Sequence, residues 1–401
     1  MLFADLRVLI SDEAAIKQSL CNKGASGLIF CIHCQNAVDH KSEIAANSGG
    51  RQISSLETDI SRFRQQTQRS VKDYMDYLAQ QQPLQSKARF EKLQTALGFN
   101  FKPMGLLAHP AYGPKMIDCI MFDWMHVYLV KWLFNVLTGL FLGDLHQHGW
   151  KHPDIQRFAD TITWPARLRG AAPKDVLHKR GSPSDSLKCS ASEALNFLQV
   201  LRTFLVLWVL PQCNEDMRNA CEVWLAMCKV LDALQKIAVG DAFSAVELQA
   251  LVKGHLDLAK ARYGADSFWV PKCHLALHLP LQLAKHSCLM SCFVHERKHK
   301  IIKKISNQVL DTSRAFEKSI LDDVLHGHVQ QLADPAFLPG EACLHACIYF
   351  FYIIYDSILL YLYKSWQHFF RLHRMQCRKG CTWFSLCGQP LPSSKPSSDD
   401  A

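Results

Sequence analysis

The sequence predicts a mainly α-helical protein with a short α/β element near its start. Apolar residues recur at helical spacing from Glu57 to Leu97, and again at about 193–210, 216–238, 244–263 and 275–287. Residues 3–10 differ, because they alternate and then run apolar as a buried strand does. We therefore expect one strand followed by a large helical region.

Composition places the chain among globular proteins. It has 401 residues, of which 49% are hydrophobic and 20% charged, and its net charge of +9 permits a polyanionic partner without demanding one. The opening residues do not have the pattern of a signal peptide, so we expect the 16 cysteines to be reduced thiols in a nuclear or cytoplasmic protein.

The first chemically suggestive residues follow the predicted strand. Asp12 stands at the carboxyl end of that strand, where open α/β sheets place their ligands. Cys31 and Cys34 then form a CxxC pair, which is half of a zinc site and requires two more ligands from elsewhere. The alternative is two reduced cysteines in the core.

A histidine pair late in the chain could supply those two ligands. His274 and His278 are four residues apart, which puts them on one helical face with Cβ atoms about 5–6 Å apart. Together with Cys31 and Cys34 they would give a closed Cys₂His₂ zinc site that pins the helical region to the start of the chain. One ligand could instead be His33, His40 or His126.

Residues 116–142 are apolar enough to raise the question of a membrane span. Charged and polar residues interrupt them, so we predict a buried core helix instead. Within it Asp123 and His126 lie three apart on one face. Buried polar groups need partners, so this pair is either a hydrogen-bonded bracket or part of a metal site.

Glu296 begins a strongly cationic stretch. The basic residues that follow it are Arg297, Lys298, Lys300, Lys303 and Lys304. Glu296 is then either a solvent-facing side chain or an acid that holds a divalent ion beside a phosphate-binding surface.

Beyond Glu296 the helical pattern continues to about Leu332. Residues 348–363 are apolar, but they are only 16 long and Asp356 interrupts them, so they are short for a membrane span. We expect the domain boundaries to fall at 1–45, 46–290, 291–335 and 336–401, the last being an atypical tail.

Four features in one order resemble the transposases of CACTA-type (En/Spm) DNA elements, a branch of the DDE/D enzymes with a (C/D)xxH signature. They are the strand-end acid, KG followed by CxxC, the DxMH of residues 123–126, and KxHxxxH followed by ERK, and they span about residues 3–330. The resemblance implies a partial RNase H-like α/β core, a large helical insertion between the second and third catalytic acids, and DNA as the partner.

The resemblance also implies roles for single residues. Asp12 matches the second catalytic acid and Glu296 the third, 284 positions later, while Asp123 and His126 match the (C/D)xxH signature. Such enzymes hold two Mg²⁺ ions about 3.5–4 Å apart. The cations after Glu296 would then contact the DNA backbone.

The chain departs from this pattern at one point. The first acid of such a core lies well upstream of the second, and only 11 residues precede Asp12. We therefore expect an N-terminally truncated fragment that is inactive alone. With the catalytic set incomplete, the sequence does not decide whether the chain is an enzyme. The alternatives are a zinc-stabilised helical module that binds DNA or protein without catalysis, and a membrane-associated protein anchored by residues 348–363. A homo-oligomer is compatible with the transposase fragment and with the zinc-stabilised module, and no small-molecule substrate is evident.

Overall fold

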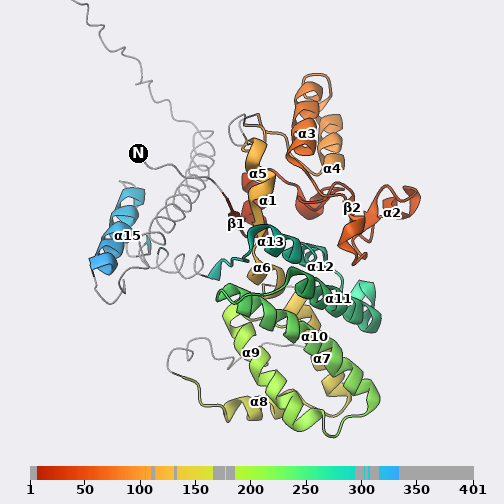
Figure 1. Cartoon of the computed structure of the whole chain (residues 1–401), viewed down its shortest axis with the longest axis vertical. Helices are drawn as coiled ribbons and strands as arrows, with labels where there is room; N and C mark the ends of the chain where they lie inside the picture. The colour runs from red at the N-terminus through yellow and green to blue at the C-terminus, as the bar shows by residue number, and fades with distance from the viewer. Residues whose placement is uncertain are drawn as a thin grey trace, which may run out of the picture. The chain divides into compact units, whose positions relative to one another are not determined.

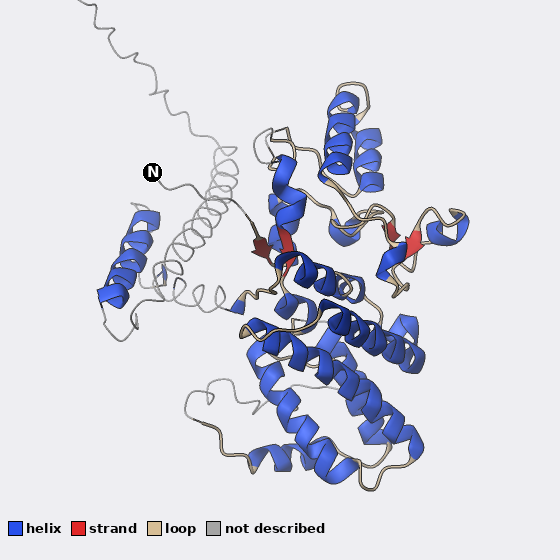
Figure 2. Ribbon diagram, viewed as in Figure 1, coloured by secondary structure: helices blue, strands red, loops and turns tan. Residues whose placement is uncertain are grey.

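The computed structural model describes residues 7–103, 105–109, 113–130, 133–165, 177, 186–293, 302, 306, 307 and 316–333. Two compact units, 1–296 and 297–401, are described separately. Helices dominate the described residues, and strands are few and short (Figures 1 and 2). The prediction of a mainly α fold is confirmed at this level. In the second unit the described helix is α15 (Phe316–Ala333), at the end of the predicted helical pattern.

The predicted N-terminal strand is present, but it is short. β1 (Leu9–Ser11) pairs in parallel with β4 (Ile120–Phe122), and Ser11 lies opposite Phe122. A second parallel pair joins β2 (Ala37–Val38) to β3 (Ile53–Ser54). In the described residues these are two separate two-stranded sheets, so an RNase H-like core stays a prediction.

Backbone contacts fix the segment that leads to the CxxC pair. α1 (Glu13–Ser19) is capped by Asp12 and is followed by a 3₁₀ turn at Gly24–Ser26. α3 (Gln68–Gln81) packs against α4 (Lys87–Leu97), which ends at Gly98 with a φ of +80°. A Cβ at Gly98 would lie 2.1 Å from the Ile29 carbonyl oxygen, so only glycine allows this approach. The Gly98 carbonyl also accepts the Lys23 N–H at 2.8 Å.

The segment of residues 44–56 contains short regular elements. α2 (Ile44–Asn47) and β3 lie within it, and a 3₁₀ turn follows at Ile60–Arg62. The residues next to it dock on α11 (Ala245–Phe268). There Thr58 Oγ1 donates to Asp257 Oδ1 at 2.8 Å, and Lys260 Nζ donates to the Leu56 carbonyl at 3.0 Å.

The prediction of a single core helix over 116–142 is wrong. The chain instead forms α5 (Gly113–Cys119), β4, α6 (Trp124–Tyr128) and α7 (Leu133–Gln147). Two interactions, one long-range and one local, interrupt the helical pattern here. Residues 120–122 found a strand partner in β1, and Asp123 starts a new helix by accepting the Met125 N–H at 2.9 Å.

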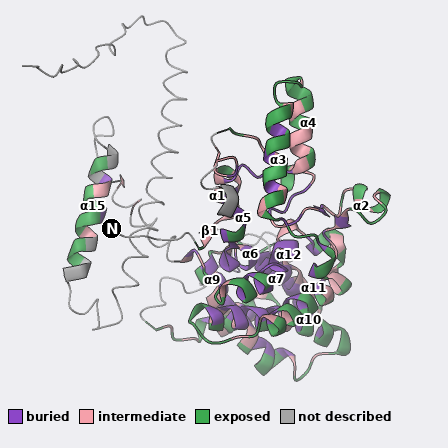
Figure 3. Ribbon diagram, turned by 45° about the horizontal axis from the view of Figure 1, so that its top comes forward, coloured by how far each residue is buried: buried purple, intermediate pink, exposed green. Residues whose placement is uncertain are grey.

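The helical region follows the predicted pattern closely. It contains α8 (His152–Asp160), α9 (Ala191–Phe204) with a π-helical continuation at Leu205–Val209, α10 (Glu215–Ala238) and α11. Ser190 caps α9 by accepting the Glu193 N–H. Buried residues line α7 and α10 (Figure 3). Between them Phe141 stacks on Trp224 at 5.5 Å, and Trp224 Nε1 donates to Thr138 Oγ1 at 3.1 Å.

The prediction of one helix over 275–287 is also wrong. The chain forms α12 (Pro271–Ala276) and α13 (Leu279–His286) instead. Pro280 explains the interruption, because it has no N–H to donate to the carbonyl four residues earlier. His274 therefore belongs to α12, whereas His278 is the residue before α13.

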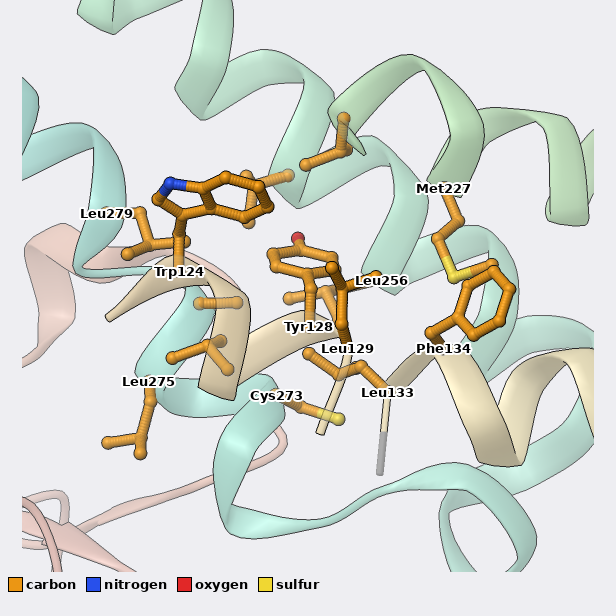
Figure 4. Close-up of a cluster of buried hydrophobic side chains, with 14 of the residues drawn as sticks. Trp124, Tyr128, Leu129, Leu133, Phe134, Met227, Leu256, Cys273, Leu275 and Leu279 are labelled. Carbon is orange, nitrogen blue, oxygen red and sulfur yellow. The ribbon is translucent and has the colours of Figure 1, made fainter. Parts of the chain in front are cut away.

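Apolar side chains of α6 join these helices into one core. Trp124 and Tyr128 lie among Leu256, Leu275 and Leu279 in the cluster that Figure 4 shows. Two segments, 124–147, in which residues 131 and 132 are not described, and 191–209, are long and apolar enough to cross a membrane by composition. In the first segment 75% of the apolar window is buried inside the fold, and in the second 44%. The hydrophobicity of the first serves the protein core, and two such segments are weak evidence for a membrane association.

Candidate metal centre

Four buried side chains converge at one point in the first unit. Cys31, Cys34, His274 and His278 place their ligand atoms within 4.8 Å of one another, and each side chain is at most 1% exposed. These are the four residues predicted as Cys₂His₂ ligands. They form a cluster that could bind a metal such as zinc. The other predicted candidates, His33, His40 and His126, are not members of it.

The spacing of the four atoms suits a tetrahedral ion. Cys34 Sγ lies 3.4 Å from His274 Nε2 and 3.3 Å from His278 Nε2, and the two Nε2 atoms are 3.2 Å apart. Cys31 Sγ lies 3.4 Å from His278 Nε2. In a tetrahedron with Zn–N bonds of about 2.0 Å and Zn–S bonds of about 2.3 Å, neighbouring ligand atoms are about 3.3–3.7 Å apart. The cluster is therefore close to the size that zinc requires.

The cysteines are held by a tight turn whose backbone is tied to a neighbouring segment. The Cys34 N–H donates to the Cys31 carbonyl at 3.3 Å, which brings the two thiols to one side of the turn. The Gln35 N–H then donates to the Arg64 carbonyl at 2.8 Å. This pairing fixes the turn in the core.

The histidines are held by the break between α12 and α13. Although they do not share one helix, the residues between them stay close to helical dihedrals, so both rings still face the same point. Phe30 and Phe63 meet the His274 ring edge to face, at centroid distances of 5.1 and 4.5 Å. These rings exclude water from one side of the cluster.

Burial and mutual contact set the ionisation of the thiols. Burial by itself raises the pKa of Cys31, but the hydrogen bond with Cys34 and the neighbouring His278 and His274 lower that pKa well below its usual value. Burial, with the hydrogen bond and the charge of Cys31, raises the pKa of Cys34 well above its usual value. The pair thus tends to hold one thiolate and one thiol, and an ion would displace the second proton.

His274 is suited to the neutral form that a metal needs. Burial lowers the pKa of His274, although the adjacent Cys31 opposes this. Within the described residues, His274 Nδ1 is buried and has no hydrogen-bond partner, so His274 Nε2 is the ring atom committed to the cluster. A neutral imidazole with Nε2 facing two thiols is a competent zinc ligand.

One glutamine links His33, a neighbour of the cluster, to β4. Gln282 Oε1 accepts the Phe122 N–H at 3.1 Å, and Gln282 Nε2 lies 3.4 Å from His33 Nε2. Burial, and next the charge of His278, lowers the pKa of His33 to about 3. The Phe122 ring also contacts the rings of His33 and His278, at 4.9 and 5.7 Å. The Cys₂His₂ cluster therefore contacts the end of β4 through the rings of His278 and Phe122.

Asp123 and His126 form the hydrogen-bonded bracket that was one of the two predicted alternatives. Asp123 Oδ2 hydrogen-bonds to His126 Nδ1, while Oδ1 caps α6. A third residue, Cys292, lies within the same 4.8 Å cluster. Cys292 was missed at the sequence level, because a single cysteine 166 positions beyond His126 gives no local signal.

The predicted catalytic residues are only partly described. Asp12 Oδ1 accepts the Ala15 N–H at 2.6 Å at the start of α1. Asp12 and Asp123 directly follow Ser11 and Phe122, which are paired residues of parallel strands. Other predicted residues lie outside the described part of the chain: Glu296, Arg297, Lys298, Lys300, Lys303, Lys304 and the apolar segment 348–363.

Comparisons with protein-family models, with curated proteins and with solved structures found no match.

Proposed function

We propose that the chain is a zinc-stabilised helical scaffold that binds DNA or protein, with Cys31, Cys34, His274 and His278 as the ligands of a structural zinc ion. The observation that carries this is the convergence of two thiols and two imidazoles at 3.2–3.4 Å in a buried position. Four protein ligands fill a tetrahedral shell, which leaves no position for a substrate. The ion would therefore stabilise the fold and take no part in chemistry.

The position of the cluster explains what such an ion would do. It joins the segment of residues 31–34 to the α12–α13 junction, and Cys34 and His274 are 240 positions apart. Through Gln282 and Phe122 it also supports the end of β4. Metal binding would thus couple the N-terminal segment to the helical region, as in other domains whose folding free energy includes the metal.

Metal analysis tests this directly. Protein purified without chelator should contain zinc, and Cys31→Ser should lose that zinc. A zinc content below about 0.2 equivalents would end the proposal, because a closed site of this kind retains its ion at neutral pH. Zinc retained at full content in Cys31→Ser would count against this choice of ligands.

A second candidate is the one that the resemblance implies, a fragment of a transposon-derived DDE-type transposase. The observation that favours it is the register of β1 and β4. Since carboxyl ends of parallel strands meet at one edge, Asp12 and Asp123 both stand at the edge where α/β sheets place ligands. Carboxylates gathered there suit Mg²⁺, a hard cation that prefers oxygen ligands.

Chain connectivity makes room for the third acid at the same edge. Cys292 lies beside Asp123, and Glu296 follows Cys292 by four residues. Four residues of chain span at most about 14 Å. An experimental structure of the full chain tests the proposal. Carboxyl carbons of Asp12 and Glu296 more than about 12 Å apart would rule out a shared pair of ions.

DNA binding is tested by its salt dependence. If Arg297, Lys298, Lys300, Lys303 and Lys304 all contact phosphates, changing the five to glutamine should lower the slope of log K against log salt by about 4–5. A matched control changes five exposed cations elsewhere, Lys87, Arg89, Lys92, Lys229 and Lys236. Equal slopes in the two variants, measured by fluorescence anisotropy, would contradict a DNA-binding role for the cationic stretch.

A further inference from the structure

We propose that Asp123, His126 and Cys292 bind a second divalent transition-metal ion, of the Zn²⁺ or Co²⁺ class, at a site separate from the Cys₂His₂ cluster. The three side chains come from two segments that are 166 positions apart, and their ligand atoms lie within 4.8 Å of one another. A carboxylate, an imidazole and a thiol that meet in this way form a common protein metal-ligand set.

The burial of these three side chains favours the binding of one shared ion. The Asp123 side chain is fully buried, Cys292 is 7% exposed and the His126 side chain is 18% exposed. A buried carboxylate needs compensating charge as well as hydrogen bonds. A divalent cation would supply charge to both the carboxylate and the thiolate at once.

The structure around the three residues is already ordered. Asp123 Oδ1 is fixed as the cap of α6, and Lys272 Nζ donates to the His126 carbonyl at 2.6 Å. Trp124 follows Asp123 and Phe293 follows Cys292 in the sequence, and the centroids of their rings are 5.9 Å apart. This ring contact holds the two segments together beside the three ligands. Ligands whose backbones are held in this way lose little freedom when an ion binds.

The direct hydrogen bond between Asp123 and His126 shows how an ion would enter. It would replace the proton of the hydrogen bond between Asp123 Oδ2 and His126 Nδ1, so that both side chains become ligands. Cys292 would provide the thiolate. Thiolate and imidazole ligands select zinc-like ions over Mg²⁺, so this site differs in kind from a carboxylate magnesium site.

The number of ligands indicates what the second ion could do. Three protein ligands leave one position of a tetrahedral ion open, as in catalytic zinc sites, and the partial exposure of His126 gives access to it. The site also lies directly after β4, at the edge that carries Asp12. An ion there could bind water or an anionic group at that edge.

The test is the metal content of the full chain by mass spectrometry after purification without chelator. We expect about two equivalents of zinc in the wild type and about one in Cys292→Ser. Cys288→Ser is the matched control, because Cys288 is an exposed thiol only four residues away, and it should keep both ions. A chelator titration should remove one equivalent at lower concentration, since an open site holds its ion less tightly than a closed one.

Equal zinc content in wild type, Cys292→Ser and Cys288→Ser would overturn the inference and leave Asp123 and His126 as a hydrogen-bonded pair. If Cys292→Ser does not fold, His126→Gln serves instead, since it keeps a hydrogen-bonding group beside Asp123. The outcome is separable from the Cys₂His₂ proposal, because Cys31→Ser tests that site and Cys292→Ser tests this one.

Discussion

Replacing Cys34 by alanine should remove both the zinc ion and a large part of the stability of the fold. Cys34 Sγ contacts both histidines of the cluster, so its loss opens the tetrahedral shell. The remaining thiol and imidazoles would then be buried without the ion that brought them together. We expect the N-terminal segment to separate from α12 and α13 at lower temperature or denaturant concentration.

The magnitude follows from the length of chain that the ion closes. Cys34 and His274 are 240 positions apart. The loop-entropy relation used for disulfides gives about 5.5 kcal/mol for a cross-link over that length. The free energy of unfolding of a domain is roughly 5–15 kcal/mol. A loss of this size would therefore remove a large part of the stability of the domain that contains the cluster.

The assay is urea unfolding followed by circular dichroism, with zinc measured on the same samples. Cys273→Ala is the matched control, because Cys273 is also a fully buried free thiol and adjoins His274 without belonging to the cluster. It should keep its zinc and lose only about 1 kcal/mol, the usual cost of a small cavity. Similar losses in the two variants, or a wild-type midpoint unchanged by chelator, would refute the role of the ion.

Three further predictions concern buried polar groups. Burial lowers the pKa of His255 to about 3 from 6.5, and neither of its ring nitrogens has a hydrogen-bond partner in the described residues. Below pH 6.5 the unfolded chain therefore binds more protons than the folded chain. The free energy of unfolding keeps its full value above pH 6.5 and falls as the pH is lowered towards 3, by about 2 kcal/mol at pH 5. His255→Phe should flatten the dependence of the unfolding free energy on pH between 5 and 7, and an unchanged slope would assign that slope to other groups. Gln282→Leu removes the acceptor of the Phe122 N–H and should cost about 1–3 kcal/mol in urea unfolding while zinc content stays constant, so a loss of zinc would show that Gln282 also orients the ligands. Thr138→Val leaves the Trp224 N–H without its partner and should lower stability by about 1–2 kcal/mol at nearly constant volume, whereas an unchanged thermal midpoint would mean that water replaces the hydroxyl.

Sequence spacing alone was enough to identify the helical character and the four candidate metal ligands. Helical periodicity depends on residues three and four apart, so α9, α10 and α11 lie close to where the pattern put them. CxxC and HxxxH are likewise local patterns whose ligand chemistry can be read directly.

What the tertiary structure decided was every feature that depends on distant partners. Residues 120–122 are apolar in either a helix or a strand, and only the approach of β1 made them a strand. The meeting of Cys34 with His274, and of Cys292 with Asp123, brings together segments more than 160 positions apart. Local sequence spacing carries no information about contacts between such distant segments. The Cys34–His274 contact could therefore be proposed only from ligand chemistry, and the Cys292–Asp123 contact is seen only in the folded chain.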